Sequence, residues 1–398
     1  MKKRDNMKII VIDTFQNSLK FTLFQMSNES IICHGLLERI GLENGRYTIQ
    51  RRDETITEEM PFEGYKEAVS TLVQKLLDLE IIASQEDIPV VGYRIPQGKN
   101  LFSKNTYLTE SELEKLDQID IDMAHIKDIK ETVEGFYETI PNVEIIGVFE
   151  TAFFQDLPEE SYLYALPYKW YQDYGVRKYG TQGITHEHIM REVQRLFQRE
   201  DVKLISCCLD KVGSIAAIKN GKCQDVSTGF SSLSGIVMGA KSGDIDSSII
   251  PYVMEKEGKN VSEILEDLNQ RSGLLGLSEI SENIEEILIA STEGNEKARI
   301  AEEQYIRHIV NYIAQYYVLL EKPDAIVFTA AIGEKNAQIR SEVLEKLSCL
   351  GIKIDPEKNK HLEGLGEITK NDSIIPVYVI PMDLELEIAK EVLKLINR

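Results

Sequence analysis

Hydrophobic and polar positions follow two different periods along this chain, and together they predict both strands and helices. Residues 8–13 (KIIVID) are a short apolar run that predicts a buried strand, and residues 19–26 alternate as a second strand does. A similar strand, loop and strand recur over residues 204–219. Asn220-Gly221 follows, a strong hairpin turn signal before a strand at 222–227. The recurrence predicts two related domains, each beginning with a β-hairpin.

Helical periodicity follows these strands. It predicts amphipathic helices over residues 65–79 and 186–199, the second capped by Thr185. Two strand–turn–helix units come later: strand 324–330, turn 331–334 and helix 337–347, then strand 374–381 and helix 384–395. Because strands and helices alternate, the predicted class is α/β.

Composition excludes several kinds of partner. The 398 residues carry a net charge of −21, which argues against nonspecific binding to nucleic acid or to an anionic membrane. No apolar run is long enough to span a bilayer, and the basic N-terminus leads directly into a strand pattern rather than a signal peptide. We therefore expect a cytoplasmic protein. The five cysteines form no C-x-x-C pair and are expected to be reduced thiols buried in strands.

Residues 147–183 carry the most informative motif. They read GVFETAFFQDLPEESYLYALPYKWYQDYGVRKYGTQG and resemble the central signature of the acetate kinase family. The resemblance extends from residue 8 to the C-terminus, because further similar segments fall in the family's order: residues 91–94 (VGYR), 238–246 (MGAKSGDID), 272–278 (SGLLGLS) and 328–334 (FTAAIGE).

The resemblance implies a fold, a reaction and an assembly. The fold would be a duplicated two-domain actin-like ATPase fold (ribonuclease H-like) with a central cleft. Residues 7–150 and 386–398 would form the first domain, and residues 151–385 a second domain that pairs two chains into a homodimer. The family reaction transfers the terminal phosphoryl group of ATP to acetate, and such transfers depend on positioning, Mg²⁺ and cationic side chains. Acetate or another short-chain carboxylate would be the acceptor.

Four positions correspond to catalytic residues of the family, and three of them carry a different residue. Glu150 stands for an Asp, Lys241 for an Arg that acts on the transferring group, and Gln182 for a His, whereas His125 aligns with a phosphoryl-contacting His. Arg94 matches an arginine that binds the substrate carboxylate. The residues themselves also allow a structural ion pair for Arg94 and a packed helix-face histidine for His125.

Nucleotide and metal positions are substituted as well. Residues 12–20 resemble the first phosphate loop, with Phe15 in place of a glycine, and residues 208–214 the second, with Asp210 and Val212 in place of two glycines. The candidate metal-binding residues are Asp13, in place of an Asn, and Glu385. The candidate nucleotide-binding residues are Ser18, Lys20, Asp210, Lys211, Val212, Gly213, Asn283, Glu285, Ala331, Gly333, Glu334 and Lys335.

The substitutions affect the phosphate, metal, cation and base subsites together. Asp210 places a negative charge beside the nucleotide phosphates, and Lys241 cannot form the planar bidentate fork of an arginine. We therefore predict a catalytically impaired or inactive member, a pseudokinase with a binding or regulatory role and an unknown protein partner. An active acyl kinase with a rearranged site, or a kinase of this fold with another substrate, stays open. Mg²⁺ and ATP are the cofactors if the chain is active; otherwise it needs none.

Overall fold

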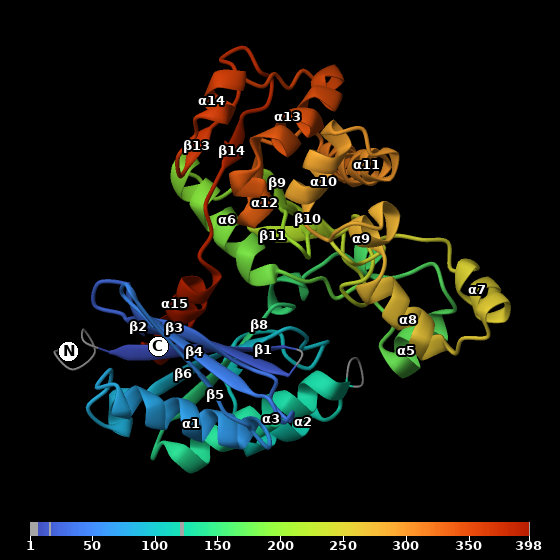
Figure 1. The fold of residues 1–398 in the computed structure, drawn as a ribbon. Helices are drawn as coiled ribbons and strands as arrows, with labels where there is room; N and C mark the ends of the chain where they lie inside the picture. The colour runs from blue at the N-terminus through green and yellow to red at the C-terminus, as the bar shows by residue number, and fades with distance from the viewer. Residues whose placement is uncertain (1–6, 16, 120–122, 398) are drawn as a thin grey trace. The chain divides into compact units, whose positions relative to one another are not determined.

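The computed structural model describes residues 7–15, 17–119 and 123–397, without the side chains of residues 123–125. The chain divides into two compact units (Figure 1). The first comprises Met1–Ala152 and Asp383–Arg398, and the second comprises Phe153–Met382. The last helix of the chain therefore belongs to the unit that the N-terminus begins.

The first unit is built on one mixed sheet with the strand order β5-β4-β3-β2-β1-β6-β8-β7. Its strands are β1 (Lys8–Phe15), β2 (Ser18–Gln25), β3 (Ser30–Glu38), β4 (Arg46–Arg51), β5 (Glu54–Glu59), β6 (Val90–Ile95), β7 (Thr106–Tyr107) and β8 (Glu144–Phe149). Its helices are α1 (Tyr65–Asp78), α2 (Glu110–Leu116), α3 (Met123–Thr139) and α15 (Leu384–Ile396). α1 and α3 cover one face of the sheet, and α15 packs on the other (Figure 1).

The central strands of this sheet bring polar side chains to one place. β1 runs parallel to β6, and β6 runs parallel to β8. β1 also pairs antiparallel with β2, so that Asp13 lies opposite Lys20. Because parallel neighbours end at the same edge of a sheet, Asp13, Arg94 near the end of β6 and Glu150 just after β8 come together.

The second unit repeats this plan with a six-stranded sheet of order β11-β10-β9-β12-β14-β13. Its strands are β9 (Lys203–Cys208), β10 (Ser214–Lys219), β11 (Lys222–Val226), β12 (Ala325–Thr329), β13 (Gly366–Glu367) and β14 (Val377–Val379). Its helices are α4 (Glu159–Tyr162), α5 (Tyr168–Tyr174), α6 (Gly183–Phe197), α7 (Ile249–Glu257), α8 (Val261–Gln270), α9 (Gly273–Ser278), α10 (Ile284–Thr292), α11 (Glu296–Leu319), α12 (Ala330–Lys335), α13 (Ala337–Lys346) and α14 (Pro356–Lys360).

The predicted fold class is confirmed, and so is the hairpin at Asn220-Gly221. Both residues have positive φ, 53° and 79°, as a two-residue primed turn between β10 and β11 requires. Each unit begins its sheet with antiparallel strands followed by parallel ones, β1-β2 in the first and β9-β10 in the second. The internal repeat seen in the sequence is therefore a repeat of structure.

Four local predictions are wrong. α6 begins at Gly183 rather than after Thr185, because Gln182 takes the left-handed conformation (φ 61°) and ends the preceding segment. β14 is shorter than residues 374–381, since prolines at positions 376 and 381 interrupt the backbone donors on both sides. The turn expected at 331–334 lies inside the helix α12. Cys349 is exposed outside any strand, unlike the other four cysteines.

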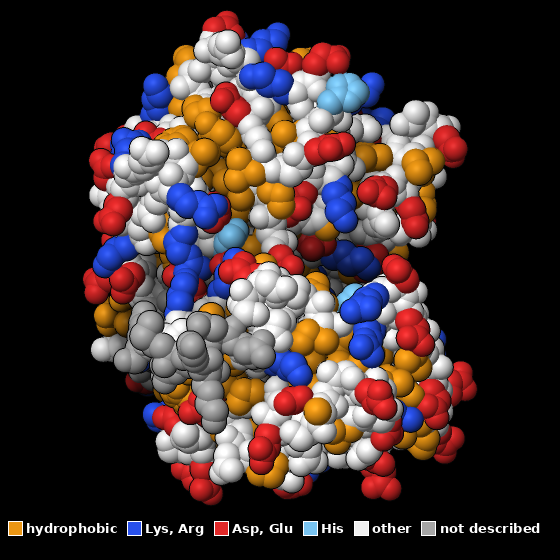
Figure 2. Space-filling model, turned by 90° about the vertical axis from the view of Figure 1, so that its left-hand side faces the viewer, with side chains coloured by type: hydrophobic (Ala, Val, Ile, Leu, Met, Phe, Trp, Pro, Cys, Tyr) orange, Lys and Arg blue, Asp and Glu red, His pale blue; other side chains and the backbone are white. Residues whose placement is uncertain are grey.

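The surface carries both signs of charge. On the face shown in Figure 2, basic side chains lie in small groups among acidic and hydrophobic ones, not in one continuous basic patch. Within the described residues, no helix combines the length and the apolar character that crossing a membrane requires.

Candidate functional site

Arg94 is the centre of a charged cluster in the first unit. Its Nε donates to Glu150 Oε1 at 2.7 Å, and its Nη1 donates to Asp13 Oδ2 at 2.8 Å. The Glu150 side chain is 2% exposed, whereas those of Arg94 and Asp13 are 26% and 21% exposed. Burial alone would lower the pKa of Arg94, but the two carboxylates outweigh it and raise that pKa. The guanidinium is therefore fixed as a cation between two acids.

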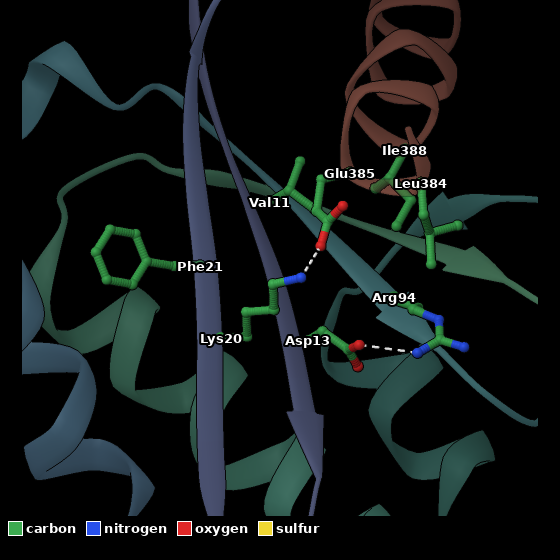
Figure 3. A pocket seen from close by; sticks show the side chains of 8 residues that line it. All are labelled: Val11, Asp13, Lys20, Phe21, Arg94, Leu384, Glu385 and Ile388. Atoms are coloured by element: carbon green, nitrogen blue, oxygen red, sulfur yellow. Dashed lines mark hydrogen bonds and ion pairs between the residues drawn. The ribbon is translucent and has the colours of Figure 1, made fainter. Parts of the chain in front are cut away.

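A second ion pair adjoins this cluster. Lys20 of β2 pairs with Glu385 at the start of α15 (Figure 3). Burial by itself raises the pKa of Glu385, yet the Lys20 ammonium, with Arg94 behind it, holds that pKa below its usual range. Leu384 and Ile388 of α15 complete the lining of a hollow of only about 10 Å³, which is room for about one water.

The residues expected to hold Mg²⁺ do not fit that ion as they are arranged. Asp13 and Glu150 each turn one oxygen to Arg94, and Glu385 turns one to Lys20. Mg²⁺ demands near-octahedral oxygen geometry, but among the described residues no three His, Cys, Asp or Glu side chains converge on a possible metal position. Basic side chains take the place beside the carboxylates that a divalent cation would need.

In the second unit, the loop between β9 and β10 closes on itself. The Asp210 carboxylate accepts a hydrogen bond from the N–H of the next residue, Lys211, at 2.7 Å. Lys211 Nζ turns away to Glu282 at 2.6 Å, and that hydrogen bond raises the pKa of Lys211. Backbone N–H groups of such loops are the donors that bind phosphate oxygens. One of them is satisfied here by the loop's own negative side chain.

The Gln182 side chain also forms hydrogen bonds with the end of this loop. Its Nε2 donates to the Val212 carbonyl at 2.9 Å, and its Oε1 accepts from Ser214 Oγ at 2.6 Å. The amide is thus used on both ends for contacts within the protein. The loop is also tied at its beginning, because the Leu209 carbonyl accepts from the N–H groups of Ile332 and Gly333 at 2.9 and 3.2 Å. Gln182, the loop and α12 consequently form one connected arrangement.

Behind Gln182 lies a buried histidine that the sequence did not bring forward. His186 Nε2 contacts Ser214 Oγ at 2.7 Å, and His186 Nδ1 contacts Ser206 Oγ at 2.8 Å. Since the Ser214 hydroxyl donates its one hydrogen to Gln182, it must accept from His186, which assigns the proton to Nε2. Burial lowers the pKa of His186 to about 3. The imidazole is therefore neutral, and it orients Gln182 through Ser214.

This burial predicts a pH dependence of stability. The unfolded-state pKa is 6.5 and the folded-state pKa about 3, so between these values the unfolded chain binds a proton that the folded chain rejects. The stabilisation is complete above pH 6.5 and is lost as pH falls, with a slope of about 1.4 kcal/mol per pH unit from this group. Urea unfolding at pH 7, 6 and 5 measures the slope in the wild type and in His186→Gln, which should lack this contribution.

His361→Gln is the matched control, because His361 is exposed. It should keep the slope of the wild type. An unchanged slope in His186→Gln would show that the buried imidazole does not resist protonation.

Two of the expected nucleotide-binding residues form local hydrogen bonds within the protein. Asn283 is the N-cap of α10, where its side chain accepts from Glu285 N–H, and Glu334 Oε1 accepts from Met382 N–H at 3.0 Å. Ala331, Lys335 and Glu285 are exposed. Gly333 is buried, and a Cβ there would meet only ordinary contacts, the nearest at 3.4 Å from Phe328.

The other predicted residues have the following places in the structure. Lys241 Nζ donates to Ser232 Oγ at 2.7 Å. Ser18 opens β2 opposite Phe15, which is 43% exposed, and Gly213 ends the β9–β10 loop. His125 lies in α3, but its side chain is outside the described residues. In the first unit, the structure brings together five of the predicted residues: Asp13, Lys20, Arg94, Glu150 and Glu385. In the second unit, it brings together Gln182, the loop residues Asp210–Gly213 and the helix α12.

Two sheets with the same order of antiparallel and parallel strands, the first completed by the C-terminal helix, define a protein of the actin-like ATPase class. A solved structure of acetate kinase from Porphyromonas gingivalis superposes with a TM-score of 0.92 at 31% identity, covering 98% of this chain and 100% of that one.

Sequence comparison gives the family. Residues 8–390 match the acetokinase family. An acetate kinase of Phytoplasma australiense is 40% identical over 393 residues, which are 98% of this chain and 99% of the relative. One of Bacillus subtilis (strain 168) is 39% identical over 392 residues, 98% and 99% of the two chains. The chain therefore belongs to the acetokinase family.

Proposed function

We propose that this member of the family has impaired or absent phosphotransfer and serves in binding or regulation. The observation that carries the proposal is the hydrogen bond from Lys211 N–H to the Asp210 carboxylate. A phosphate oxygen would have to displace that carboxylate and then lie beside its negative charge. Both effects oppose binding of a triphosphate.

The cations support the same proposal. Arg94 and Lys20 face three carboxylates, Asp13, Glu150 and Glu385, so three negative charges against two positive ones leave this cluster at −1. Arg94 and Lys20 are thus already paired with carboxylates before any anionic substrate binds. Lys241, for its part, offers a point charge where a bidentate guanidinium would stabilise the transferring group.

The magnitudes make the loss large. An arginine on a transferring phosphoryl group contributes about 10³–10⁵ in rate, and removing a preorganised donor costs about 10²–10³. Taking about 10³ and 10² against a turnover of about 1–100 per second leaves on the order of 10⁻⁵ to 10⁻³ per second. Such effects are not additive when residues act as a unit, but each acts in the same direction.

A binding and turnover experiment tests the proposal. Mg·ATP and acetate are titrated into the protein by calorimetry, and phosphotransfer is followed by a coupled assay, with the Bacillus subtilis acetate kinase as control. We expect turnover at least 10³-fold below the control, with weak or undetected ATP binding. Acetyl phosphate formation at a rate near the control's would overturn the proposal.

An active acyl kinase with a rearranged site is the second candidate. The observation that favours it is the direct contact of Arg94 with Glu150, because an arginine and a carboxylate stay side by side at matching family positions. Mg²⁺ and ATP would then be its cofactors, and a short-chain carboxylate its acceptor. ATP binding without acetate turnover in the same experiment would point instead to another substrate.

We also propose that the protein is cytoplasmic and forms a homodimer through its second unit. Large apolar side chains are exposed on three helices of that unit: Tyr168, Trp170 and Tyr174 on α5, Ile249 and Tyr252 on α7, and Val261 and Leu265 on α8. Exposed apolar surface of this kind marks interaction sites. The pseudokinase proposal adds an unidentified protein partner, for which a co-purifying protein would be the observation.

Tyr252→Glu tests the dimer. Tyr252 is 62% exposed, and a charge buried at an interface core typically costs about 2 kcal/mol or more. We expect a shift from dimer to monomer at micromolar concentration in sedimentation velocity. Val318→Glu changes a more exposed apolar residue on α11, 74% exposed, and should leave the assembly intact. A dimer unaffected by Tyr252→Glu would exclude α7 from the interface.

A further inference from the structure

A second hollow lies inside the second unit, between α13, α14 and the end of β14. Its volume is about 320 Å³, within the range of about 300–1,000 Å³ typical of small-molecule sites. Lys335, Arg340 and Lys360 line it, together with Glu334, Asn359 and Pro381. We propose that this α13–α14 pocket binds a small organic polyanion that carries clustered carboxylate or phosphate groups.

Arg340 is the first reason. Its side chain is buried, with 2% of the residue exposed. Its guanidinium donates to the Gly333 and Glu334 carbonyls at 2.9 and 2.7 Å, and to the side-chain and backbone oxygens of Asn359 at 2.7 and 3.0 Å. Burial lowers the pKa of Arg340 to about 10, so the group is still charged at neutral pH. All four acceptors are neutral, and hydrogen bonds to neutral oxygens orient the cation without cancelling its charge.

The charge around the pocket is the second reason. Lys335 and Lys360 are exposed at its rim, and within the described chain neither they nor Arg340 form an ion pair with an acidic residue. Glu334 is the one acid among the described lining residues, and its carboxylate accepts from Met382 N–H. Three basic groups against one acid leave the lining at +2 in a chain of net charge −21.

The backbone of α13 adds to the positive charge around the pocket. Ala337, the first residue of the ten-residue helix α13, also lines the pocket. The N-terminus of a helix carries the positive end of its dipole, equivalent to roughly +0.5 charge.

The pocket is separate in its contacts from the β9–β10 loop. The loop accepts hydrogen bonds from the N–H groups of Ile332 and Gly333 in α12. On the pocket side, Arg340 donates to the carbonyls of Gly333 and Glu334 in the same helix. A polyanion bound beside Arg340 would therefore lie next to the side chain that holds these α12 carbonyls. Two of the lining residues, Glu334 and Lys335, are also among the candidate nucleotide-binding positions.

Calorimetric titration of the full chain with citrate and with inorganic phosphate tests the proposal. We expect saturable citrate binding that Lys360→Glu weakens at least tenfold, because this change reverses a rim charge. Lys370→Glu makes the same change in net charge at an exposed lysine outside the pocket and should alter the affinity less than twofold. Tighter binding of citrate than of phosphate assigns a polycarboxylate, and the reverse order assigns a phosphate ester; either supports the site.

Two results would overturn it. The wild type could bind neither anion at millimolar concentration, or the two charge reversals could weaken citrate equally, which would make the effect one of net charge alone. Lys335→Ala, which changes another lining lysine, gives a second variant in case Lys360→Glu fails to fold, as judged by circular dichroism. Since citrate binding is measured directly, the result is independent of whether the chain transfers phosphoryl groups.

Discussion

Replacing Asp210 by glycine is expected to tighten ATP binding by about 10- to 100-fold, a gain of about 1.4–2.8 kcal/mol. The Asp210 carboxylate occupies the Lys211 N–H at 2.7 Å. Glycine frees that donor and removes a negative charge from the loop. A single donor aimed at developing charge is worth about 10²–10³ in rate, so a variant that also turns over ATP faster would agree with this origin. Calorimetry with Mg·ATP gives the affinity.

Asp210→Asn separates the two effects. The amide oxygen can still accept from Lys211 N–H, whereas the negative charge is gone. We expect an affinity between those of the wild type and Asp210→Gly, with a weaker dependence on salt than the wild type because charge repulsion is screened. If neither variant gained affinity for ATP, the closed loop would not be what keeps the nucleotide out.

Arg94→Met is expected to have the largest effect on stability. Glu150 is almost completely buried, and Arg94 is the cation that faces it. Breaking a buried ion pair from one side typically costs about 3–5 kcal/mol, and because Arg94 and Asp13 are partly exposed we expect about 2–3 kcal/mol here. Differential scanning calorimetry measures the loss, which should appear in the transition of the first unit.

A second substitution identifies the cause. Glu150→Gln in the Arg94→Met background removes the buried charge and should recover part of the lost stability, giving a coupling between the two sites. Lys66→Met is the matched control, since Lys66 pairs with Glu134 and Glu138 on the surface of the same unit. Exposed pairs are worth about 0–1 kcal/mol. A loss in Arg94→Met no larger than in Lys66→Met would mean that the cluster does not stabilise the unit.

Most of the fold was predictable because it rests on periodicity and turn chemistry. The apolar run at β1 and the Asn220-Gly221 turn report local preferences that the tertiary structure keeps. α6 was misplaced at its start because a left-handed Gln182 is not recognisable from its side chain. β14 was predicted too long because β-branched residues flank the prolines that limit its ladder.

The site was predictable only as a set of positions. Motif order identified Asp13, Arg94 and Glu150, but their mutual contacts depend on three strands far apart in sequence. The Gln182–Ser214–His186 chain was missed because a His and a Ser in apolar segments look like ordinary core residues. Arg340 carried no local signal at all, since its partners are mostly backbone carbonyls.

The return of α15 to the first unit has a consequence for synthesis. Ile388 and Val392 of this helix press on Gly92 in β6, so close that a Cβ added there would meet Val392 at 2.8 Å. Residues 384–396 leave the ribosome only after the whole contiguous stretch 153–382 has emerged. The face of the first sheet that α15 covers therefore stays uncovered until this helix is made. A chaperone that recognises nascent chains would find its target on β1 and β6, and deletion of α15 would leave that target open.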